Sequence, residues 1–176
     1  MEVPSSLVHR LFYPQVPLVL AAQSGKRFSA MPVVSYASVS DTPPLVAVSC
    51  NPKGFTCKLA MKARAFSLSV LDADRVRSVS SLASTSGAKT DDKLRAAGLA
   101  HSPGRSLKVP CIDGAEATLE LTLNSHRRLG DHTLLVGKVE AAYSSRAFDG
   151  YWDFRQYTPM LYTGWKDGMT TYNPAE

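Results

Sequence analysis

Short stretches rich in strand-forming residues, separated by turn signals, recur along most of the chain. They are Val16–Gln23, Phe28–Val39, Leu45–Cys50, Phe66–Leu71, Leu107–Ile112, Ala117–Leu123 and His132–Ala142. In Phe66–Leu71 the apolar side chains alternate with two serines, which indicates a strand with one buried face. Pro32 interrupts the second stretch and predicts an edge strand, a bulge or an irregular segment there.

Turn signals divide these stretches and predict where the strands end. They are Ser24–Arg27, Asp41–Pro44, Asn51–Gly54 and Arg127–Asp131. Near the end of the chain, Met160–Tyr162 and Met169–Tyr172 predict a closing hairpin around Gly164–Gly168. The aromatic residues are dense after position 150, and this density predicts core packing, a dimer interface or a wall for a planar ligand.

Helical signals are few and short. Thr56–Arg64 fits a helix with Thr56 as its N-cap, and Asp72 or Asp74 can cap a helix that runs to about Ala83. Asp91–Ala97 predicts one or two further helical turns, whereas Ser84–Lys89 and Ala100–Ser106 are expected to be loops. Strands and helices do not alternate regularly, so the pattern favours a mainly β barrel over a doubly wound parallel sheet.

Composition is that of a folded protein of ordinary size. The chain has 176 residues, of which 44% are hydrophobic and 20% charged, and we interpret residues 1–176 as one domain. The net charge of +5 is spread along the sequence, which argues against a nucleic-acid binder. No segment approaches a membrane span, and we expect a cytoplasmic protein without a membrane partner.

The sequence contains no motif typical of a metal site or of a set of disulfide bonds. The three cysteines, Cys50, Cys57 and Cys111, form no CxxC pair, and the four histidines show no ligand spacing. Reduced thiols and no metal site are therefore expected.

Two segments have the composition of anion-binding loops. Ser49–Lys58 joins the end of a strand to the start of a helix, where free N–H groups attract phosphate, and Lys53 and Lys58 add positive charge. Ser84–Lys93 combines hydroxyl residues, a glycine and two lysines. Each segment also fits a plain alternative, an ordinary helix start in the first case and a solvated loop in the second. Neither matches a Walker loop or a GxGxxG fingerprint.

A third segment, Gly130–His132, opens a strand at a turn. A histidine there can donate to a ligand carbonyl or to a flavin ring atom, and it can pair with Asp131. No GxSxG elbow accompanies it, so the pair does not indicate a hydrolase.

The order of these segments is more specific than any one of them. Arg27–Pro52, Phe55–Ala60 with Ala65–Leu71, Val109–Pro110, Ala117–Glu120 and Gly130–Val139 follow one another. In this order the chain resembles the flavin-reductase-like family of FMN-binding split barrels over about residues 10–165, with an aromatic C-terminal extension at 147–176. The resemblance implies a Greek-key split β-barrel with a few short peripheral helices. It also implies a homodimer with FMN at or near the subunit interface.

The resemblance further implies a set of site residues. Val34, Ser35, Tyr36, Ala37 and Ser38 would lie along the isoalloxazine ring. Ser49, Asn51, Thr56 and Lys58 would hold the phosphate with Cys50 beside them, and Ser86, Gly87 and Lys89 would close over it from the same or the other subunit. His132 would be catalytic, on the substrate side of the flavin.

The implied activity is electron transfer from NADH or NADPH through FMN to free flavin (FAD or riboflavin included), a monooxygenase partner, ferric iron or another acceptor. Three alternatives stay open. One is a non-catalytic, flavoredoxin-like FMN protein. The second is a relative of the pyridoxamine-phosphate oxidases, and the third is a barrel that binds no flavin.

Overall fold

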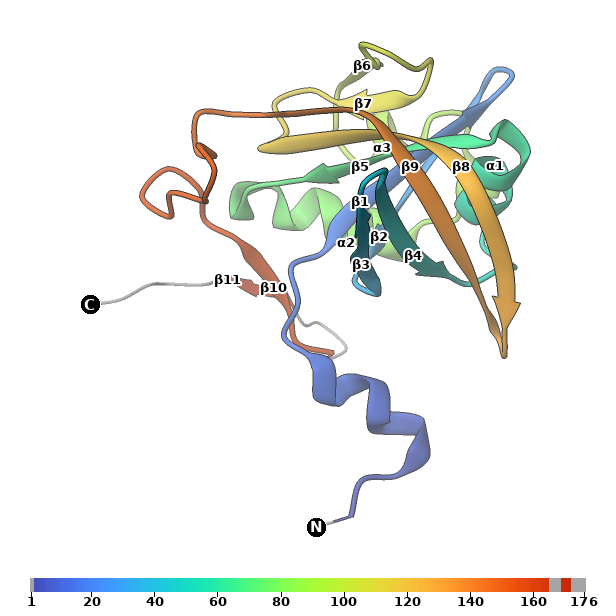
Figure 1. Cartoon of the computed structure of the whole chain (residues 1–176), viewed down its shortest axis with the longest axis vertical. Coiled ribbons are helices and arrows are strands. Elements are labelled where there is room, and N and C mark those ends of the chain that lie inside the picture. Colours follow the sequence, from blue (N-terminus) through green and yellow to red (C-terminus); the bar gives the residue numbers. More distant parts are fainter. Residues whose placement is uncertain (1, 165–168, 172–176) are drawn as a thin grey trace.

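The computed structural model describes residues 2–164 and 169–171. Its strands are β1 (Leu18–Ser24), β2 (Arg27–Val33), β3 (Tyr36–Asp41), β4 (Pro44–Cys50), β5 (Ala65–Val70), β6 (His101–Pro103), β7 (Pro110–Ile112), β8 (Ala117–Leu129), β9 (His132–Ser144), β10 (Met160–Tyr162) and β11 (Met169–Thr171). The α-helices are α1 (Phe55–Ala63), α2 (Val76–Ser84) and α3 (Lys93–Ala96), and 3-10 helices span η1 (Ser5–Phe12), η2 (Ala73–Arg75) and η3 (Gly87–Lys89). Figure 1 shows a β body from which η1 projects.

One antiparallel sheet of seven strands forms the body, in the order β2-β1-β5-β8-β9-β4-β3. Side chains from both halves of this sheet meet in one apolar cluster, which includes Leu20 of β1, Phe66 of β5 and Leu135 of β9. The sheet must therefore curl strongly around that cluster. Within the described ranges no ladder joins its two edge strands, β2 and β3.

β1 lies at the centre of the packing because both of its faces are buried. Leu18 and Leu20 point into the curled sheet, whereas Val19 and Ala21 face a second cluster built from α2, α3, β7 and β10. This explains why Leu18–Ala22 reads as a continuous apolar run rather than as an alternating one.

Several predicted elements are confirmed. Each strand of the body overlaps a predicted stretch, and β8 and β9 extend beyond theirs. β10 and β11 pair as the predicted hairpin, although Trp165–Gly168 and Tyr172 lie outside the described residues. β2 is an edge strand, which accounts for Pro32. Asp72 caps η2, which leads directly into α2.

Three predictions were wrong. Phe28–Val39 is divided between β2 and β3, because the chain leaves one edge of the curled sheet after Val33 and enters the other at Tyr36. Part of Ala100–Ser106 forms β6, which pairs with β7. The turn expected over Arg127–Asp131 is confined to Gly130–Asp131, because β8 and β9 continue past the core as an exposed hairpin arm. Gly130 has a positive φ of 56°, which suits glycine in this tight turn.

None of the helices in the described part of the chain has the length and apolar character needed to cross a membrane.

Candidate functional site

The two segments predicted to bind anions come together in space. The start of α1 and the loop before α3 line one hollow of about 300 Å³, which we call the anion hollow. Its lining residues are Lys53, Gly54, Phe55, Thr56, Lys58, Thr85, Ser86, Gly87, Ala88 and Lys93. The hollow thus combines a helix start with three lysines, and Thr56, Lys58, Ser86 and Gly87 of the predicted site belong to it.

The start of α1 leaves backbone donors available. Gly54 is the N-cap residue and no side chain caps the helix. The first bond of the helical type runs from the Lys58 N–H to the Gly54 carbonyl at 3.1 Å. The N–H groups of residues 55–57 therefore have no acceptor within the described part of the chain. Unpaired N–H groups and the helix dipole make such a position suited to a phosphate.

Thr56 does not act as the predicted N-cap. It lies inside α1, is buried, and its hydroxyl is 2.8 Å from the hydroxyl of Ser29 on β2. The N-cap lies two residues earlier, at Gly54, where the turn closed by the Gly54 N–H and the Asn51 carbonyl ends, so Thr56 faces β2 from the second position of the helix. Its side chain ties α1 to the sheet at the edge of the anion hollow.

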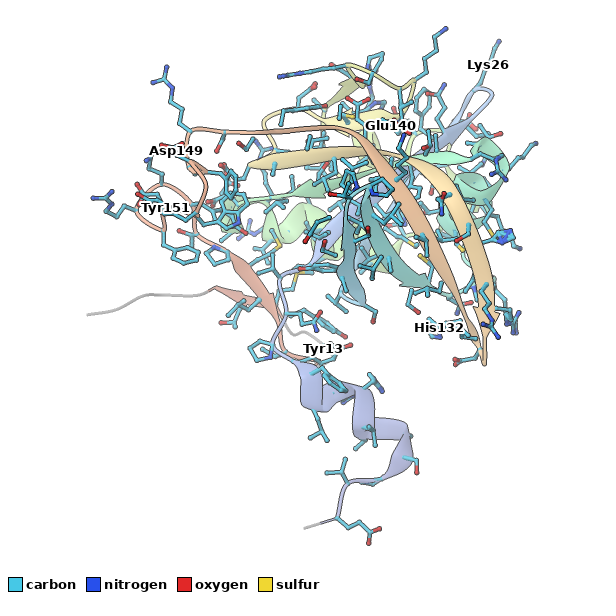
Figure 2. The ribbon with its side chains drawn as sticks, viewed as in Figure 1. Tyr13, Lys26, His132, Glu140, Asp149 and Tyr151 are labelled. Atoms are coloured by element: carbon cyan, nitrogen blue, oxygen red, sulfur yellow. The ribbon has the colours of Figure 1, made fainter. Side chains whose placement is uncertain are left out.

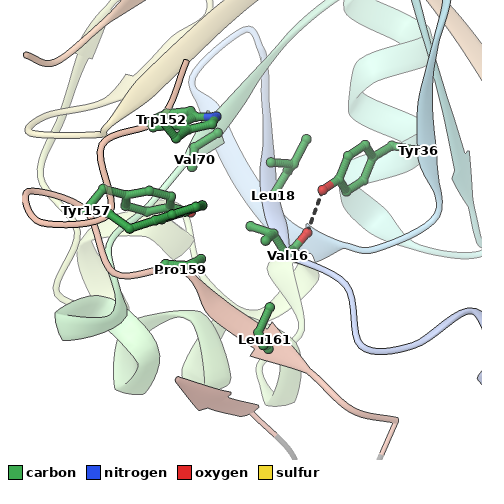
Figure 3. Close-up of a pocket in the computed structure, with 9 residues that line it drawn as sticks. Val16, Leu18, Tyr36, Val70, Trp152, Tyr157, Pro159 and Leu161 are labelled. Atoms are coloured by element: carbon green, nitrogen blue, oxygen red, sulfur yellow. Dashed lines mark hydrogen bonds between the residues drawn. The ribbon is translucent and has the colours of Figure 1, made fainter. Parts of the chain in front are cut away.

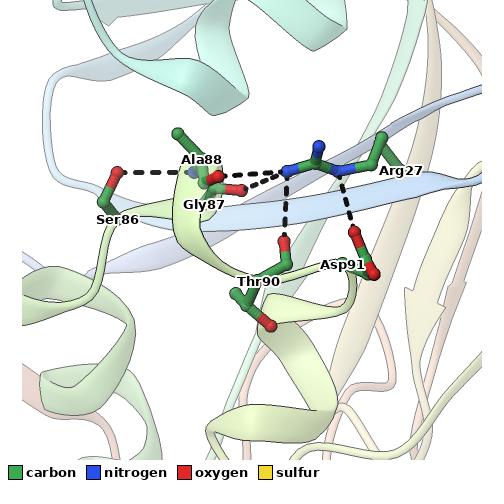
Figure 4. A network of polar contacts seen from close by, with 6 residues as sticks. All are labelled: Arg27, Ser86, Gly87, Ala88, Thr90 and Asp91. Atoms are coloured by element: carbon green, nitrogen blue, oxygen red, sulfur yellow. Dashed lines mark hydrogen bonds and ion pairs between the residues drawn. The ribbon is translucent and has the colours of Figure 1, made fainter.

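The opposite wall of the anion hollow is fastened by Arg27 on β2. Its guanidinium donates to the carbonyl oxygens of Gly87, Ala88 and Thr90 at 3.2–3.4 Å and forms an ion pair with Asp91 at 3.4 Å (Figure 4). The same guanidinium stands 5.1 Å from the centre of the Phe55 ring. Arg27 therefore holds the loop and α1 in a fixed relation. A sequence pattern does not reveal this role, because 60 residues separate Arg27 from Gly87.

Gly87 is required by close packing. A Cβ atom at this position would lie 2.1 Å from the Ser29 hydroxyl oxygen and 2.9 Å from the Phe55 ring. The loop can approach α1 this closely only because residue 87 has no side chain. Ser86 precedes it as the N-cap of η3, and its hydroxyl accepts from the Ala88 N–H at 3.4 Å.

Lys93, one of the two lysines of the predicted Ser84–Lys93 segment, lines the anion hollow although the family resemblance did not imply a role for it. Its side chain is buried, and the ammonium donates to the Ala30 carbonyl at 2.7 Å. Burial lowers the pKa of Lys93. The positive charge of Lys93 beside the hollow attracts an anion. Lys93 differs from the nearby Lys89, which is exposed, in being buried against β2.

A second, longer hollow continues from the same region of the chain. It measures about 840 Å³, and we call it the long cleft. Its lining residues are Ser5, Ser6, His9, Tyr13, Pro32, Val33, Val34, Ser35, Ser49, Cys50, Asn51, Asp131 and His132. The short segment 51–53 connects its wall to that of the anion hollow, and there the Lys53 N–H donates to the Asn51 side-chain oxygen at 2.9 Å.

His132 lines the long cleft at the start of β9 (Figure 2), next to Thr133, which pairs with Cys50 at the end of β4. Its Nδ1 is 2.8 Å from a carboxylate oxygen of Asp131. This hydrogen bond lowers the pKa of Asp131. It also orients the ring, so that Nε2 is left for a group in the cleft.

Two buried thiols lie at the long cleft, and one of them, Cys50, belongs to its lining. The thiol of Cys50 is hydrogen-bonded to that of Cys57, and this contact together with burial raises the pKa of Cys50. The same bond lowers the pKa of Cys57, with help from His132 and Lys58 and against the effect of burial. Neither effect was foreseen from the sequence, where the cysteines showed no pairing motif.

Four predicted residues lie outside both hollows. Tyr36 faces a different cavity and donates its hydroxyl to the Val16 carbonyl at 2.8 Å. Ala37 and Ser38 are exposed on β3, and Lys89 is exposed on η3. The remaining ten, His132 among them, line the anion hollow or the long cleft.

The chemistry of the two hollows fits a flavin mononucleotide. Free helix N–H groups and lysines suit a phosphate, and the long cleft offers hydroxyl, amide and backbone groups beside the apolar Val33 and Val34. Residues near the phosphate would be those of the anion hollow, and Val34, Ser35, Ser49 and Asn51 would line the rest.

Comparison with known proteins agrees with this reading. The chain is 32% identical over 158 residues to an uncharacterized protein of Aeropyrum pernix. The matched region covers 89% of this chain but only 60% of that longer relative. An FMN-binding protein from Thermus thermophilus, solved with bound 1-cyclohex-2-enone, is 32% identical with a TM-score of 0.82, covering 100% of this chain and 94% of that one.

Two more distant structures share the fold. A flavoredoxin from Methanosarcina acetivorans has a TM-score of 0.86 at 21% identity and covers 100% of this chain and 92% of its own. An NADH:FAD oxidoreductase from Streptomyces globisporus has a TM-score of 0.80 at 24% identity and covers 99% of this chain and 98% of its own. The model of the flavin reductase like domain matches residues 9–163. The chain therefore belongs to the flavin reductase-like domain family.

Proposed function

We propose that this protein binds FMN across the anion hollow and the long cleft, and that it is an oxidoreductase that transfers electrons from NADH or NADPH to free flavin or another acceptor. The observation that carries the proposal is the meeting of the free N–H groups of α1 with the Ser86–Gly87 loop, next to a cleft that His132 lines. The similarity to an FMN-binding protein at 32% identity supports the choice of flavin.

Residues of the anion hollow would hold the phosphate. The N–H groups of residues 55–57 point along the start of α1, and Lys53 and Lys58 add charge at its rim. Arg27 and Gly87 act indirectly, because they fix the distance between α1 and the loop. This division predicts that the hollow distinguishes phosphorylated from unphosphorylated flavins.

Residues of the long cleft would orient the ring and the electron donor. The bound cofactor supplies the hydride and electron chemistry. The protein contributes positioning through residues 34 and 35 on the cleft wall, where the Ser35 carbonyl accepts a hydrogen bond from the Ser49 N–H at 2.8 Å. In its protonated form, with Nδ1–H bonded to Asp131, His132 would donate a hydrogen bond from Nε2 to a carbonyl oxygen of the flavin or the nicotinamide.

We also propose that the sheet forms a Greek-key split barrel and that two copies associate near the flavin. Support for association comes from η1, which borders the long cleft through Ser5, Ser6 and His9. The same helix exposes Leu11 at 66% and Phe12 at 71%. An apolar helix face beside a ligand cleft is suited to burial against a second copy.

The test is the visible spectrum of the purified protein with added FMN, followed under anaerobic conditions after addition of NADH or NADPH. Binding of FMN and bleaching of its absorption by one of the nicotinamides are expected. No uptake of FMN would contradict the whole proposal. Binding of FMN without bleaching by either nicotinamide would contradict only the proposal that NADH or NADPH is the electron donor.

Two variants assign the parts of the site. Lys58→Ala is expected to weaken FMN binding more than riboflavin binding, because only FMN carries the phosphate; an equal effect on both would reject the phosphate assignment. His132→Ala is expected to slow nicotinamide-dependent flavin reduction while FMN stays bound. If that variant instead lost FMN and reacted normally per bound flavin, His132 would be a binding residue.

A second candidate is an FMN protein that receives its electrons from a protein donor rather than from a nicotinamide. The structural similarity to a flavoredoxin favours it. In this case neither NADH nor NADPH would bleach the bound FMN, whereas a chemical reductant such as dithionite would.

A further inference from the structure

An aromatic cavity separate from the long cleft lies on the other side of the segment that joins β2 to β3. Ser35 lines the long cleft, whereas its neighbour Tyr36 lines this cavity. Consecutive residues of an extended chain point to opposite sides, so the two hollows share one stretch of backbone as a wall. The cavity is therefore distinct from the site assigned above to the flavin.

The cavity has the size and lining of a small-molecule site. Its volume is about 610 Å³, within the range of about 300–1,000 Å³ typical of ligand pockets. Its lining residues are Val16, Leu18, Tyr36, Val70, Trp152, Phe154, Tyr157, Pro159 and Leu161. Figure 3 shows Trp152 and Tyr157 on one side and Val16 and Leu18 on the other. Flat aromatic walls of this kind favour a flat aromatic ligand.

One polar group in this lining lacks a partner. Tyr157 is 3% exposed, and its hydroxyl makes no hydrogen bond within the described part of the chain. Burial raises the pKa of this hydroxyl, and the phenol of Tyr36, which lines the same cavity, adds to the effect. A buried hydroxyl without a partner is unfavourable and normally meets a ligand, a water or a protein group.

The ring of Tyr157 is held in place by its neighbours. Its centre is 4.7 Å from that of Trp152 and 6.3 Å from that of Phe154. On the opposite side, Tyr36 is fixed by its bond to the Val16 carbonyl at 2.8 Å, which leaves its oxygen able to accept. An apolar cavity with a few positioned polar groups selects for a ligand that carries a matching oxygen.

We propose that this cavity binds a flat aromatic molecule that carries one hydroxyl or carbonyl oxygen, with the oxygen bonded to Tyr157. The ligand packs between Trp152 and the Val16–Leu18 wall. The site is independent of flavin binding, so it is tested in protein saturated with FMN, where the long cleft is filled.

The experiment compares 1-naphthol with naphthalene by isothermal titration calorimetry on the full chain. The two probes share their apolar area and differ by one hydroxyl. The wild type is expected to prefer 1-naphthol by about tenfold, the equivalent of one hydrogen bond to a buried partner. Tyr157→Phe is expected to bind both probes equally, with naphthalene affinity unchanged. Tyr151→Phe, the same substitution at an exposed neighbour in the same segment, is expected to behave like the wild type.

Trp152→Ala is a second variant, and it is expected to weaken both probes because it removes an aromatic wall. Circular dichroism and thermal unfolding establish that each variant is folded. A preference for 1-naphthol that survives in Tyr157→Phe would overturn the proposal, as would absence of binding by the wild type. If binding appeared only after Leu11→Ser and Phe12→Ser together, the cavity would be filled by the η1 helix of a second copy, which also overturns it.

Discussion

The anion hollow and the aromatic cavity place polar groups in opposite ways. In the anion hollow the buried side chains are bonded to the chain itself, as Thr56 is to Ser29 and Lys93 is to Ala30, and backbone N–H groups are left for a ligand. In the aromatic cavity the Val16 carbonyl accepts a hydrogen bond from Tyr36, and the Tyr157 hydroxyl has no partner within the described part of the chain, so it can bond to a ligand. The first arrangement recognises charge, and the second recognises the position of a single oxygen.

This contrast explains why the two regions differ in how firmly they are held. Arg27 fixes the wall of the anion hollow through three carbonyls and an ion pair. The aromatic cavity is held by ring packing, which tolerates small changes in shape more readily than a network of directional bonds. Substitutions in the two regions should therefore have different consequences for binding and for stability.

The largest effect is expected from Gly87→Ala, which breaks the contact between the loop and α1. The new Cβ would overlap the Ser29 hydroxyl, and the loop must move away. Overpacking of this kind costs about 1–3 kcal/mol, which corresponds to roughly 5- to 150-fold weaker FMN binding if the displacement falls on the bound state. A fluorescence titration with FMN measures it, and Ala83→Ser on the exposed face of α2 is the control. Unchanged affinity would mean that the loop does not contact the flavin phosphate.

A pair of substitutions compares the two regions directly through stability. Thr56→Val leaves the buried Ser29 hydroxyl without its partner and should lower the free energy of unfolding by about 1–3 kcal/mol. Tyr157→Phe removes a hydroxyl that has no partner among the described residues, so it should leave the free energy of unfolding unchanged or higher in ligand-free protein. Urea unfolding measures both. Equal losses in the two variants would show that the Tyr157 hydroxyl is already bonded.

A smaller, pH-dependent effect is expected at Asp92, which positions α3 and thereby Lys93. Burial works to raise its pKa, but the bonds from His101 and the Arg95 N–H outweigh it, so the pKa of Asp92 is lowered. A carboxylate whose pKa is lower in the folded than in the unfolded protein stabilises the fold fully at pH values above the unfolded-state pKa. This stabilisation is lost as the pH falls through the folded-state pKa. Asp92→Asn should therefore lower the free energy of unfolding by about 1 kcal/mol near neutral pH.

Urea unfolding across a pH series checks this dependence, and Asp149→Asn in an exposed loop is the control. The difference between wild type and Asp92→Asn should disappear in acid, below the ordinary value of 3.8. A difference that stays constant with pH would show that the charge of Asp92 is not involved.

Much of the candidate site could be predicted from local patterns. The start of α1 and the Ser84–Lys93 loop were recognised by residue type, and the contact between His132 and Asp131 is confirmed at 2.8 Å. The prediction for Thr56 was wrong because a capping residue and a buried core hydroxyl look the same in sequence. The role of Arg27 was missed and the burial of Lys93 was not foreseen, because each side chain bonds to a carbonyl about 60 residues away.

By itself, the sequence determined where strands and helices form and which segments carry anion-binding groups, because alternation, turn residues and helix starts are properties of neighbouring residues. Only the tertiary structure decided which of these segments meet. The register of the curled sheet sets Gly87 against Ser29 and turns Tyr36 away from the long cleft. Such contacts depend on strand pairing and on which side of the sheet a residue faces, and a shift of one residue would reverse them.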